Sequence, residues 1–441
     1  MQQLAKKLRF QLWVVNALFR RYRRMILVSF VGGLILFIIG LRIVPVLAQN
    51  LAKEHKIIGL VGVYSPTNLP VTIQRLVSLG LTDIDTSGNA IASLASSWAV
   101  SADGKVYVFH LQDNLYWHDG KKFSASDVNY NLRDVEFSAS DATTLKVMLK
   151  EPFTPLPTFL SKPLFRTGLI GLGSYKIAAI RLKGEMVAYL RLEPLSNDLP
   201  LLEIKFYPSE TLAKTAFKLG EVNVLDEITD VKTFKDWKNI TRSETVKTNQ
   251  YVGIFFNLEN QLLSKKENRQ ALAFAIEKPD KNRVATPLSS MSWAYTNRIK
   301  QYDKDLDQSK KLITTSSATL TLSTVPQYLS LAQTIAASWE AIGVKTKVKV
   351  EDGIPQQFEA LLAPQEIPPD PDQYSLWHST QLQTNITHYA NPKIDKLLED
   401  GRKEKVEDKR KKIYFDFQRY LVEDAPAIFL FHPTTYTISR K

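Results

Sequence analysis

The chain has 441 residues, a formal net charge of +12 and no cysteine. The lack of cysteine excludes a disulfide framework, a thiolate metal site and a thiol nucleophile. The first 48 residues hold eight of the 57 basic residues and none of the 45 acidic ones, so the remaining chain carries only +4. This charge gives little support for a nucleic-acid partner. The roughly 390 residues that follow are enough for two lobes.

One uncharged apolar run, MILVSFVGGLILFIIGL, occupies residues 25–41. At about 1.5 Å per residue, a helix continued to residue 48 would cross a hydrocarbon core of about 30 Å. Seven basic residues precede this run, and the first acid in the chain is Glu54. Because basic flanks stay in the cytoplasm, we predict a basic cytoplasmic leader over 1–24, a transmembrane anchor over 25–48 and an extracytoplasmic remainder.

Two other interpretations of this run stay open. Small residues at Val46-Leu47-Ala48 suit cleavage after Ala48 by a signal peptidase, although the leader and the apolar run are long for a secretory signal. A buried core helix is the other interpretation, but two glycines and the lack of a polar face argue against it.

The most informative stretch runs from Ala95 to Leu132. Turns are expected within it at Ser101–Gly104 and Trp117–Gly120, and the alternation over Val106–Leu111 predicts a strand between them. Ser124–Asp127 has the pattern of a capping box that opens a short helix. Thirteen residues follow the order W-x-x-S-x-D-G-x-x-Y-x-F-x-L, then W-x-D-G, then A-x-D-V: Trp98, Ser101, Asp103, Gly104, Tyr107, Phe109, Leu111, Trp117, Asp119, Gly120, Ala125, Asp127 and Val128.

This pattern resembles the signature of the dipeptide, oligopeptide and nickel type of extracellular solute-binding protein (family 5), the receptor subunit of ABC importers. Further segments resemble the family in the same order along the chain: Gly171–Tyr175, Lys218–Val224, Gly253–Asn257, Asn268–Ile276, Asp370–Asp372, Tyr389–Leu397 and Glu423–Pro426. The resemblance implies an α/β, two-lobed periplasmic-binding-protein-like fold of class II type, preceded here by a transmembrane helix. Lobe I would be 57–250 plus 425–441, and lobe II 255–424. The chain would cross between them near 251–257 and 424–426.

Periodicity predicts the main elements independently of the family. Strands are expected at 57–63, at 344–350 and at 427–431, the last in the interior. In the strand 344–350 the lysines are expected to face outward, and Val344, Val348 and Val350 to be buried. Helices are expected after a capping box at Ser264–Glu267, over 328–342, and from Asn391-Pro392. Helices that alternate with strands are typical of an α/β protein.

Motifs for catalysis are lacking. The sequence has no glycine-rich phosphate loop and no Gly-x-Ser-x-Gly elbow, and none of its six histidines pair at i, i+4. We therefore expect no enzyme activity, no cofactor and no metal, and a secreted hydrolase is a minor alternative.

Two tryptophans lie in polar, irregular stretches, Trp293 and Trp377. Aromatic side chains in such places wall ligand pockets or simply pack, and both interpretations stay open, whereas Trp98 and Trp117 are expected to pack. The candidate ligand-binding residues are Tyr64, Ser65, Phe255, Asn257, Trp293, Glu366, Asp370, Asp372, Trp377 and His378.

The chain departs from the family at two places. Peptide-binding members often hold the ligand amine with an aspartate three residues before Asp-Pro-Asp, where this chain has Ile367, beside Glu366. The interval from Val128 to Gly171 is also short for the family, which predicts a reduced accessory subdomain.

These observations predict a single-pass receptor of the cell membrane that captures a peptide or other small solute and delivers it to a separate ABC permease by closure of two lobes. The alternative is a degenerate relative that no longer transports and acts as a sensory or adhesive ectodomain.

Overall fold

The computed structural model describes residues 54–314 and 318–441, and residues 13, 21–25, 28–29, 31–35, 37–39 and 41 before them. The chain divides into two compact units, Met1–His55 with Ser196–Leu201, and Lys56–Leu195 with Leu202–Lys441. The described residues between 21 and 41 are helical. Among the described residues, no helix has both the length and the apolar character that crossing a membrane requires. Most of the predicted leader, and residues 26, 27, 30, 36, 40 and 42–48 of the predicted anchor, lie outside the described residues.

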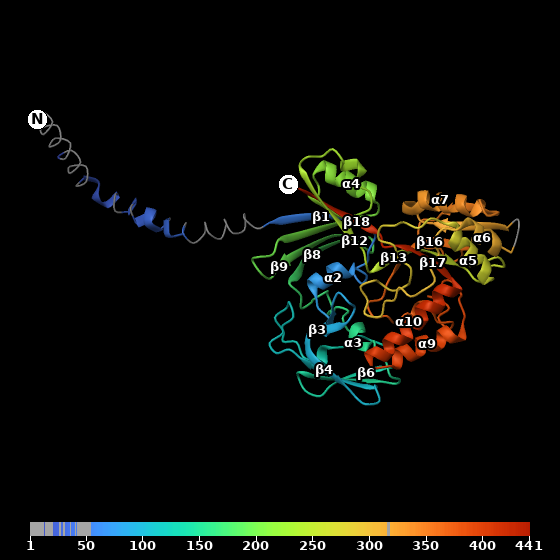
Figure 1. Cartoon of the computed structure of the whole chain (residues 1–441). Coiled ribbons are helices and arrows are strands. Elements are labelled where there is room, and N and C mark those ends of the chain that lie inside the picture. The colour runs from blue at the N-terminus through green and yellow to red at the C-terminus, as the bar shows by residue number, and fades with distance from the viewer. Residues whose placement is uncertain are drawn as a thin grey trace, which may run out of the picture. The chain divides into compact units, whose positions relative to one another are not determined.

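A seven-stranded sheet contains both early and late parts of the chain (Figure 1). β1 pairs in parallel with β11, and β18 pairs antiparallel with both β11 and β12. The strand predicted at 57–63 is therefore confirmed as an interior strand, shifted by two residues. The order across the sheet is β12 (Ile240–Val246), β18 (Thr434–Arg440), β11 (Val224–Ile228), β1 (His55–Val61), β10 (Leu201–Tyr207), β9 (Met186–Pro194) and β8 (Tyr175–Lys183).

A five-stranded sheet forms the centre of the larger apolar core. Its order is β15 (Val344–Val350), β14 (Ala318–Thr324), β16 (Ala360–Glu366), β13 (Gln250–Phe256) and β17 (Ala427–Phe431). β15 is an edge strand whose Lys345, Lys347 and Lys349 point outward as predicted. The expectation that Val350 is buried was wrong, because this last residue of an edge strand is exposed.

Two smaller sheets carry the signature stretch. One pairs β2 (Thr82–Ile84) with β3 (Ala90–Ala92), and the other has the order β4 (Ala95–Val100), β5 (Val106–Leu111), β7 (Thr144–Leu149) and β6 (Val135–Ala139). The predicted strand 106–111 is confirmed. Ser124 and Asp127 do form a capping box, but they close only the single 3-10 turn Ala125–Asp127. Trp117 is buried, as expected of a packing residue.

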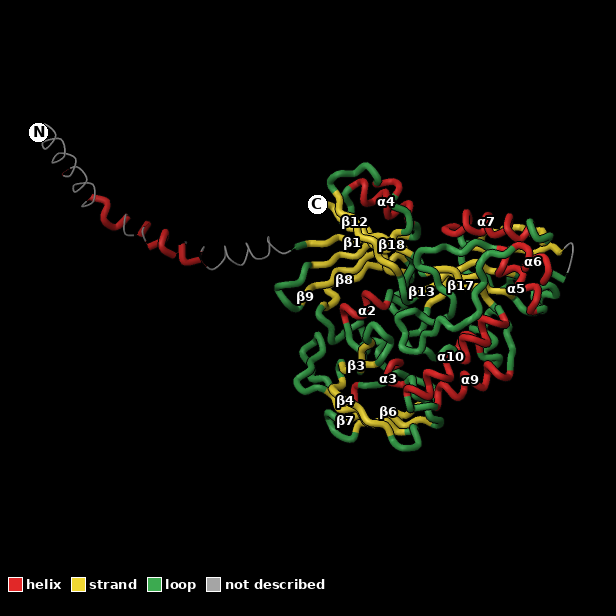
Figure 2. The backbone as a smooth tube through the Cα atoms, viewed as in Figure 1, coloured by secondary structure: helices red, strands yellow, loops and turns green. Residues whose placement is uncertain are grey.

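Helices cover the sheets (Figure 2). α7 packs on β14 and β15, α4 packs on β11, and α9 packs on α10. The predicted start at Asn391-Pro392 is confirmed, since Asn391 accepts from the Lys393 amide. The predicted cap at Ser264 was wrong: α5 starts after Lys265 without a side-chain cap, because the Ser264 hydroxyl donates back to the Gln261 carbonyl. The α-helices after residue 54 are, in the described part of the chain, α2 (Val71–Val77), α3 (Leu156–Phe159), α4 (Glu210–Leu219), α5 (Lys266–Ala275), α6 (Leu306–Leu312), α7 (Leu329–Glu340), α8 (Tyr374–Trp377), α9 (Pro392–Lys403) and α10 (Glu407–Asp424).

The chain passes twice between the two large sheets. The first passage lies between β12 and β13, at 247–249, and the second between β17 and β18, at 432–433. The two passages are bonded to each other, since the Lys247 amide donates to the Pro433 carbonyl at 2.9 Å. The crossings were predicted at 251–257 and 424–426. The observed passages lie before the first range and after the second, because β13 and β17 pair with each other and so both belong to the five-stranded sheet.

Two glycines bring a loop against the C-terminal end of α2. The Gly173 amide donates to the Val77 carbonyl at 2.8 Å. A Cβ at Gly171 would lie 2.1 Å from the Val77 carbonyl oxygen, and one at Gly173 would lie 2.5 Å from that of Leu76. The Gly-Leu-Gly segment at 171–173 is thus a backbone-to-backbone contact that positions α2 and admits no side chain.

Replacing Gly173 by Ala tests this contact. Because the obstructing atoms are backbone, the new methyl group has to displace α2 or the loop, and we expect a loss of about 1–3 kcal/mol or more in unfolding free energy by urea denaturation. Gly353, with open space where its Cβ would be, is the matched control, and G353A should leave stability nearly unchanged. If G173A and G353A were equally stable, the close approach of Gly173 to α2 would not require glycine.

A buried ion pair joins the segment before α8 to α10. Arg410 is 5% exposed and Asp370 is 8% exposed. The guanidinium Nη1 lies 2.9 Å from Asp370 Oδ2, and Nη2 lies 2.5 Å from Oδ1. Arg410 Nε also donates to the Gly401 carbonyl at 2.7 Å. Burial opposes the charge of the Arg410 guanidinium, but the Asp370 carboxylate raises its pKa above the ordinary value, so Arg410 is charged in the folded protein.

We expect D370A to destabilise the fold by about 3–5 kcal/mol, because it leaves the Arg410 charge buried without its carboxylate. The double variant D370L/R410M removes both charges and should cost clearly less than D370A alone. Urea unfolding checks the order, with D400A, which breaks an exposed pair with Lys396, as a control expected to cost under about 0.5 kcal/mol. A double variant as unstable as D370A would contradict the charge argument.

Candidate functional site

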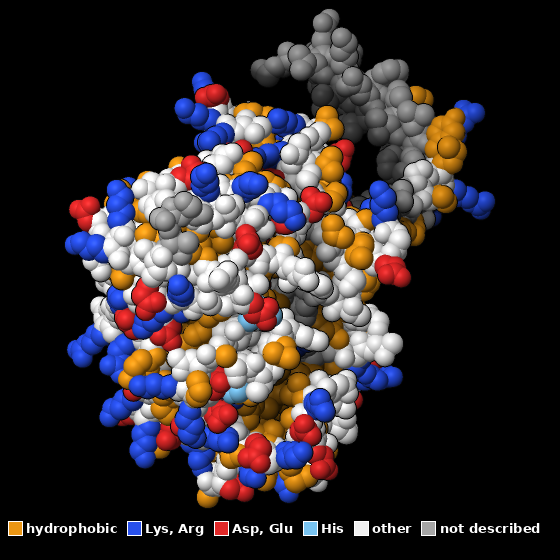
Figure 3. All heavy atoms as spheres, turned by 90° about the vertical axis from the view of Figure 1, so that its right-hand side faces the viewer, with side chains coloured by type: hydrophobic (Ala, Val, Ile, Leu, Met, Phe, Trp, Pro, Cys, Tyr) orange, Lys and Arg blue, Asp and Glu red, His pale blue; other side chains and the backbone are white. Residues whose placement is uncertain are grey.

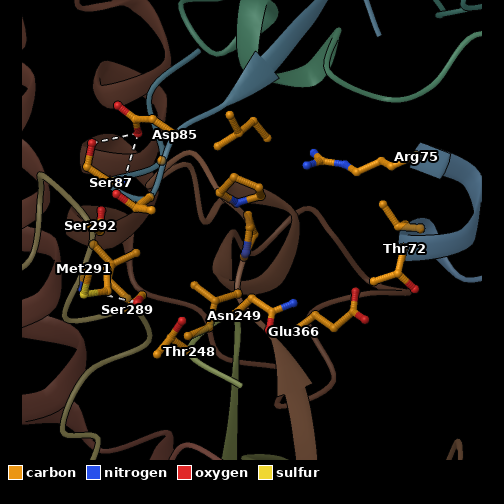
Figure 4. Close-up of a pocket in the computed structure, with 18 residues that line it drawn as sticks. Thr72, Arg75, Asp85, Ser87, Thr248, Asn249, Ser289, Met291, Ser292 and Glu366 are labelled. Atoms are coloured by element: carbon orange, nitrogen blue, oxygen red, sulfur yellow. Dashed lines mark hydrogen bonds between the residues drawn. The ribbon is translucent and has the colours of Figure 1, made fainter. Parts of the chain in front are cut away.

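A cavity of about 490 Å³ lies where the first passage between the sheets meets the end of β16 (Figure 4). Its volume is within the range of small-molecule sites. Five segments contribute to its wall: α2, the β2–β3 loop, the passage at 248–249, the loop 288–292 and the end of β16. The lining residues are Val71, Thr72, Arg75, Ile84, Asp85, Thr86, Ser87, Gly88, Thr248, Asn249, Leu288, Ser289, Met291, Ser292, Glu366, Ile367, Pro368 and Pro369.

One face of α2 forms a side of the cavity. Val71, Thr72 and Arg75 line it, and spacings of three and four residues put such side chains on one helical face. The opposite face is buried through Ile73 and Val77. Arg75 Nη1 lies 3.1 Å from Asp83 Oδ1, and its side chain is 41% exposed. The helix thus projects a partly solvated guanidinium into the cavity.

The β2–β3 loop is held by its own aspartate. Asp85 Oδ1 accepts from the Ser87 amide at 2.9 Å, the Ser87 hydroxyl at 2.7 Å and the Asn89 amide at 2.8 Å. These bonds, the Ser87 hydroxyl foremost, lower the pKa of the Asp85 carboxyl. Asp85 is therefore ionised, and its acceptor capacity on this oxygen is already used within the loop.

The same loop touches the opposite wall through backbone atoms. The Trp293 amide donates to the Ser87 carbonyl at 3.2 Å. Gly88 has a φ of +93°, and a Cβ there would lie 2.3 Å from the Pro369 carbonyl oxygen. This contact closes one end of the cavity and requires glycine.

The end of β16 contributes a carboxylate without a protein partner to the wall of the cavity. The Ile367 amide donates to the Asn249 carbonyl at 2.8 Å, which ties the end of β16 to the passage between the sheets. Glu366, the last residue of β16, lines the cavity. Among the described residues, none pairs with its carboxylate, which is free to receive a cationic or hydrogen-bond-donating group.

A second cavity of about 330 Å³ adjoins the first at Gly88. Two tryptophans, Trp98 and Trp293, line it with the buried Asp370–Arg410 pair. Arg410 lies 5.5 Å from the Trp293 ring centroid, so that ring packs against a charge already neutralised by Asp370. Lys405 and Glu407 also contribute to the wall.

The ten predicted ligand-binding residues do not meet in one cavity. Glu366 lines the first cavity, and Trp293 and Asp370 line the second. Phe255 and Trp377 surround a void of only about 10 Å³, and Trp377 is 2% exposed. Both side chains pack in the apolar core around the five-stranded sheet.

The other predicted residues lie away from both cavities. Tyr64 packs edge-on against Phe206, with ring centroids 5.5 Å apart, and Ser65 bonds Thr67 in the same loop. Asn257 donates to the Phe358 carbonyl at 3.1 Å, and Asp372 accepts from Arg402 at 2.9 Å.

His378 is buried beneath Tyr374, whose ring lies 4.0 Å from it. Its Nε2 lies 3.5 Å from a Glu399 carboxylate oxygen, and its Nδ1 lies 4.0 Å from one of Asp395. Across the described part of the chain, no group of three His, Asp or Glu side chains has a geometry that could hold a metal ion.

Sequence reasoning missed Arg75, Ser87, Gly88 and Asn249. The Asp-Thr-Ser-Gly order at 85–88 is a turn signal that could have indicated the loop. Nothing in the sequence around Arg75 distinguishes it from an exposed helical arginine, because the cavity beside it is formed by segments distant in the chain.

Comparison with known proteins agrees with this architecture. The model of the bacterial extracellular solute-binding proteins, family 5, matches residues 89–136 and 131–383. The oligopeptide-binding protein AppA of Bacillus subtilis is 22% identical over 85% of this chain and 84% of its own length. The dipeptide-binding protein of Escherichia coli is also 22% identical, over 86% of each chain.

Solved structures share the fold. CtaP of Listeria monocytogenes superposes with a TM-score of 0.76 at 22% identity, covering 88% of this chain and 94% of its own. NikZ of Campylobacter jejuni, solved in complex with Ni(L-His), has a TM-score of 0.75 at 24% identity and the same coverage. The predicted α/β, two-lobed periplasmic-binding-protein-like fold is thereby confirmed. The chain belongs to family 5 of the bacterial extracellular solute-binding proteins, which are extracytoplasmic binding proteins of ABC importers and not enzymes.

Proposed function

We propose that the protein is a membrane-tethered receptor that captures short peptides outside the cell for an ABC importer. The observation that carries this proposal is the cavity at the passage between the two large sheets, with the unpartnered Glu366 carboxylate in its wall. Peptides suit such a site because they present a cationic amine, backbone donors and acceptors, and apolar side chains. The relatives named oligopeptide- and dipeptide-binding proteins support the same ligand class.

Glu366 is the residue that we propose for the ligand amine. The next residue in the chain, Ile367, is uncharged. We propose that Trp293 and Asp370 contact longer ligands from the second cavity. The remaining predicted residues would act indirectly, by fixing the walls: Tyr64, Ser65, Phe255, Asn257, Asp372, Trp377 and His378.

Hinge closure is the proposed mechanism of capture. Lobe I would hold 57–250 and the C-terminal strand, and lobe II would run from 255 to the end of β17. The paired passages at 247–249 and 432–433 would form the hinge. Opening would break backbone hydrogen bonds, such as those from the Trp293 amide to the Ser87 carbonyl and from the Thr154 amide to the Arg402 carbonyl, the second 2.8 Å long. The free-energy cost would be small, because water can replace these bonds.

Native mass spectrometry of the full chain, purified in mild detergent without denaturation, tests the function. We expect extra mass that resolves into short peptides after denaturation. A peptide at a hundred times its Kd should also stabilise the fold by about 2.7 kcal/mol. E366Q should weaken retention because it removes the negative charge, whereas the exposed control E136Q should not. A protein that stays bare and gains no thermal stability from a mixed peptide library would support the non-transporting ectodomain instead.

The anchor is proposed from residues 25–48 and the basic leader before them. We expect the full chain to sediment with membranes and to withstand carbonate extraction, and added protease to digest its C-terminal part in intact cells or spheroplasts. A variant that lacks 1–48 behind a cleavable secretion signal is the control, and should be released. An intact mass that begins at Gln49 would show cleavage after Ala48 and overturn the anchor.

The distribution of surface charge gives no support for a nucleic-acid partner. On the face shown in Figure 3, blue and red side chains are interspersed, without a large area of one sign. Nucleic-acid-binding surfaces instead collect basic side chains on one face or along one groove.

A further inference from the structure

A lysine on one wall of the second cavity contacts the Ser101–Gly104 turn of the other wall. The Lys405 ammonium donates to the Ala102 carbonyl, and its Nζ lies 3.4 Å from the Ser101 carbonyl oxygen. The turn belongs to the stretch that carries the family signature, but it lines neither cavity. We propose that this contact is a latch, which holds the two walls together and slows the release of a bound ligand. The inference rests on the proposed function and adds a control of ligand release to it.

The turn directs its carbonyl groups at the lysine. The Gly104 amide donates to the Ser101 carbonyl at 3.0 Å, and the Val106 amide donates to the Ser101 hydroxyl oxygen at 2.9 Å. The same hydroxyl donates to Asp103 Oδ1. The polar side chains are therefore used within the turn itself, and its carbonyl oxygens are the groups that reach the opposite wall.

Gly104 makes room for the lysine. Its φ of +73° favours glycine, and a Cβ there would lie 3.5 Å from Lys405 Cδ and 3.2 Å from Pro152 Cβ. The methylene stem of the lysine therefore packs against the turn while its ammonium bonds the carbonyls. The Ser-x-Asp-Gly order of the signature thus supplies both the acceptors and the space for Lys405.

The connection between α9 and α10 holds Lys405 in place. The Val406 amide donates to Glu404 Oε1 at 2.7 Å, a bond within the connection. Arg410 of α10 donates to the Gly401 carbonyl at 2.7 Å and belongs to the buried ion pair that joins α10 to the segment before α8. Because the lysine extends from a rigid part of its wall, less conformational entropy is lost when the contact forms.

Arg402 strengthens the contact beside the lysine. Its carbonyl accepts from the Thr154 amide at 2.8 Å. Its guanidinium carbon lies 5.2 Å from the Phe153 ring centroid and 3.8 Å from that of Tyr374, and a cation at such distances attracts an aromatic ring. Phe153 belongs to the same wall as the turn, and Tyr374 to the wall of Lys405, so the guanidinium contacts both walls.

The latch lies away from the chain passages. In Figure 1, the C-terminal end of α9 lies beside the sheet that contains β4 and β6, on the side of the molecule away from β12 and β18. A rotation at 247–249 and 432–433 would separate the walls most at positions far from these passages, and would therefore break the Lys405 bonds. Because Lys405 is exposed, water can replace these bonds, so the latch restrains opening without preventing it.

Ligand release from the full chain in mild detergent tests the latch. The protein is loaded with an equimolar library of peptides of two to five residues, diluted, and followed by native mass spectrometry. K405M keeps most of the stem but loses the ammonium, and should release its peptides about fivefold faster, the factor expected for one lost hydrogen bond. K405R keeps a cationic donor and should stay near the wild-type rate. So should K403M, the matched substitution at the exposed last residue of α9.

A distance measurement tests the latch without any peptide. Because the chain has no cysteine, spin labels can be placed at two exposed sites, S97C on β4 and T334C on α7. Double electron–electron resonance then reports the separation of the walls. The labelled chain with Lys405 should populate the shorter distances more than the same chain with K405M.

Release of peptides by K405M at the wild-type rate, or distances that K405M leaves unchanged, would overturn the latch while the proposed function stands. Failure of wild type to retain any peptide would reject the proposed function, and the distances alone would then decide whether Lys405 holds the walls together. Unchanged thermal unfolding of K405M establishes that a difference comes from the contact and not from the fold.

Discussion

The rest of the structure depends on two chain passages that are bonded to each other. The Lys247 amide donates to the Pro433 carbonyl, and the His432 ring bonds the Gln250 carbonyl at 2.6 Å. Each passage is only two or three residues long, so neither large sheet can be displaced far from the other. Because Thr248 and Asn249 also line the cavity, the wall of the site and the connection between the sheets are the same piece of backbone. A small rotation there changes the shape of the site directly.

Backbone contacts, more than side-chain charges, close the site. Gly88 meets the Pro369 carbonyl, Ser87 accepts from the Trp293 amide, and Gly173 donates to Val77. Such bonds are individually worth about 1 kcal/mol and can be replaced by water. In contrast, the Asp370–Arg410 pair is buried and holds one wall rigid. The molecule thus combines a rigid wall with individually weak contacts between its walls.

The sequence predicted the fold well because the relevant signals are local. Alternation identified strands 106–111 and 344–350, and the Asn391-Pro392 pair identified the start of α9. The site was predicted poorly because it is assembled from five segments distant in the chain. Trp377 has the same kind of sequence surroundings as Trp293, yet its short helix α8 turns it into the core. Tertiary packing decides such cases, and a single sequence does not contain that information.

Electrostatics then decides what the cavity can select. Asp85 has to be ionised to hold its loop, so its charge is structural and constant. Arg75 and Glu366 are different, because the first is only partly satisfied by Asp83 and the second has no partner in the described part of the chain. Opposite charges left open in one cavity cost little while water fills it. They become strong once a ligand displaces the water and lowers the local dielectric.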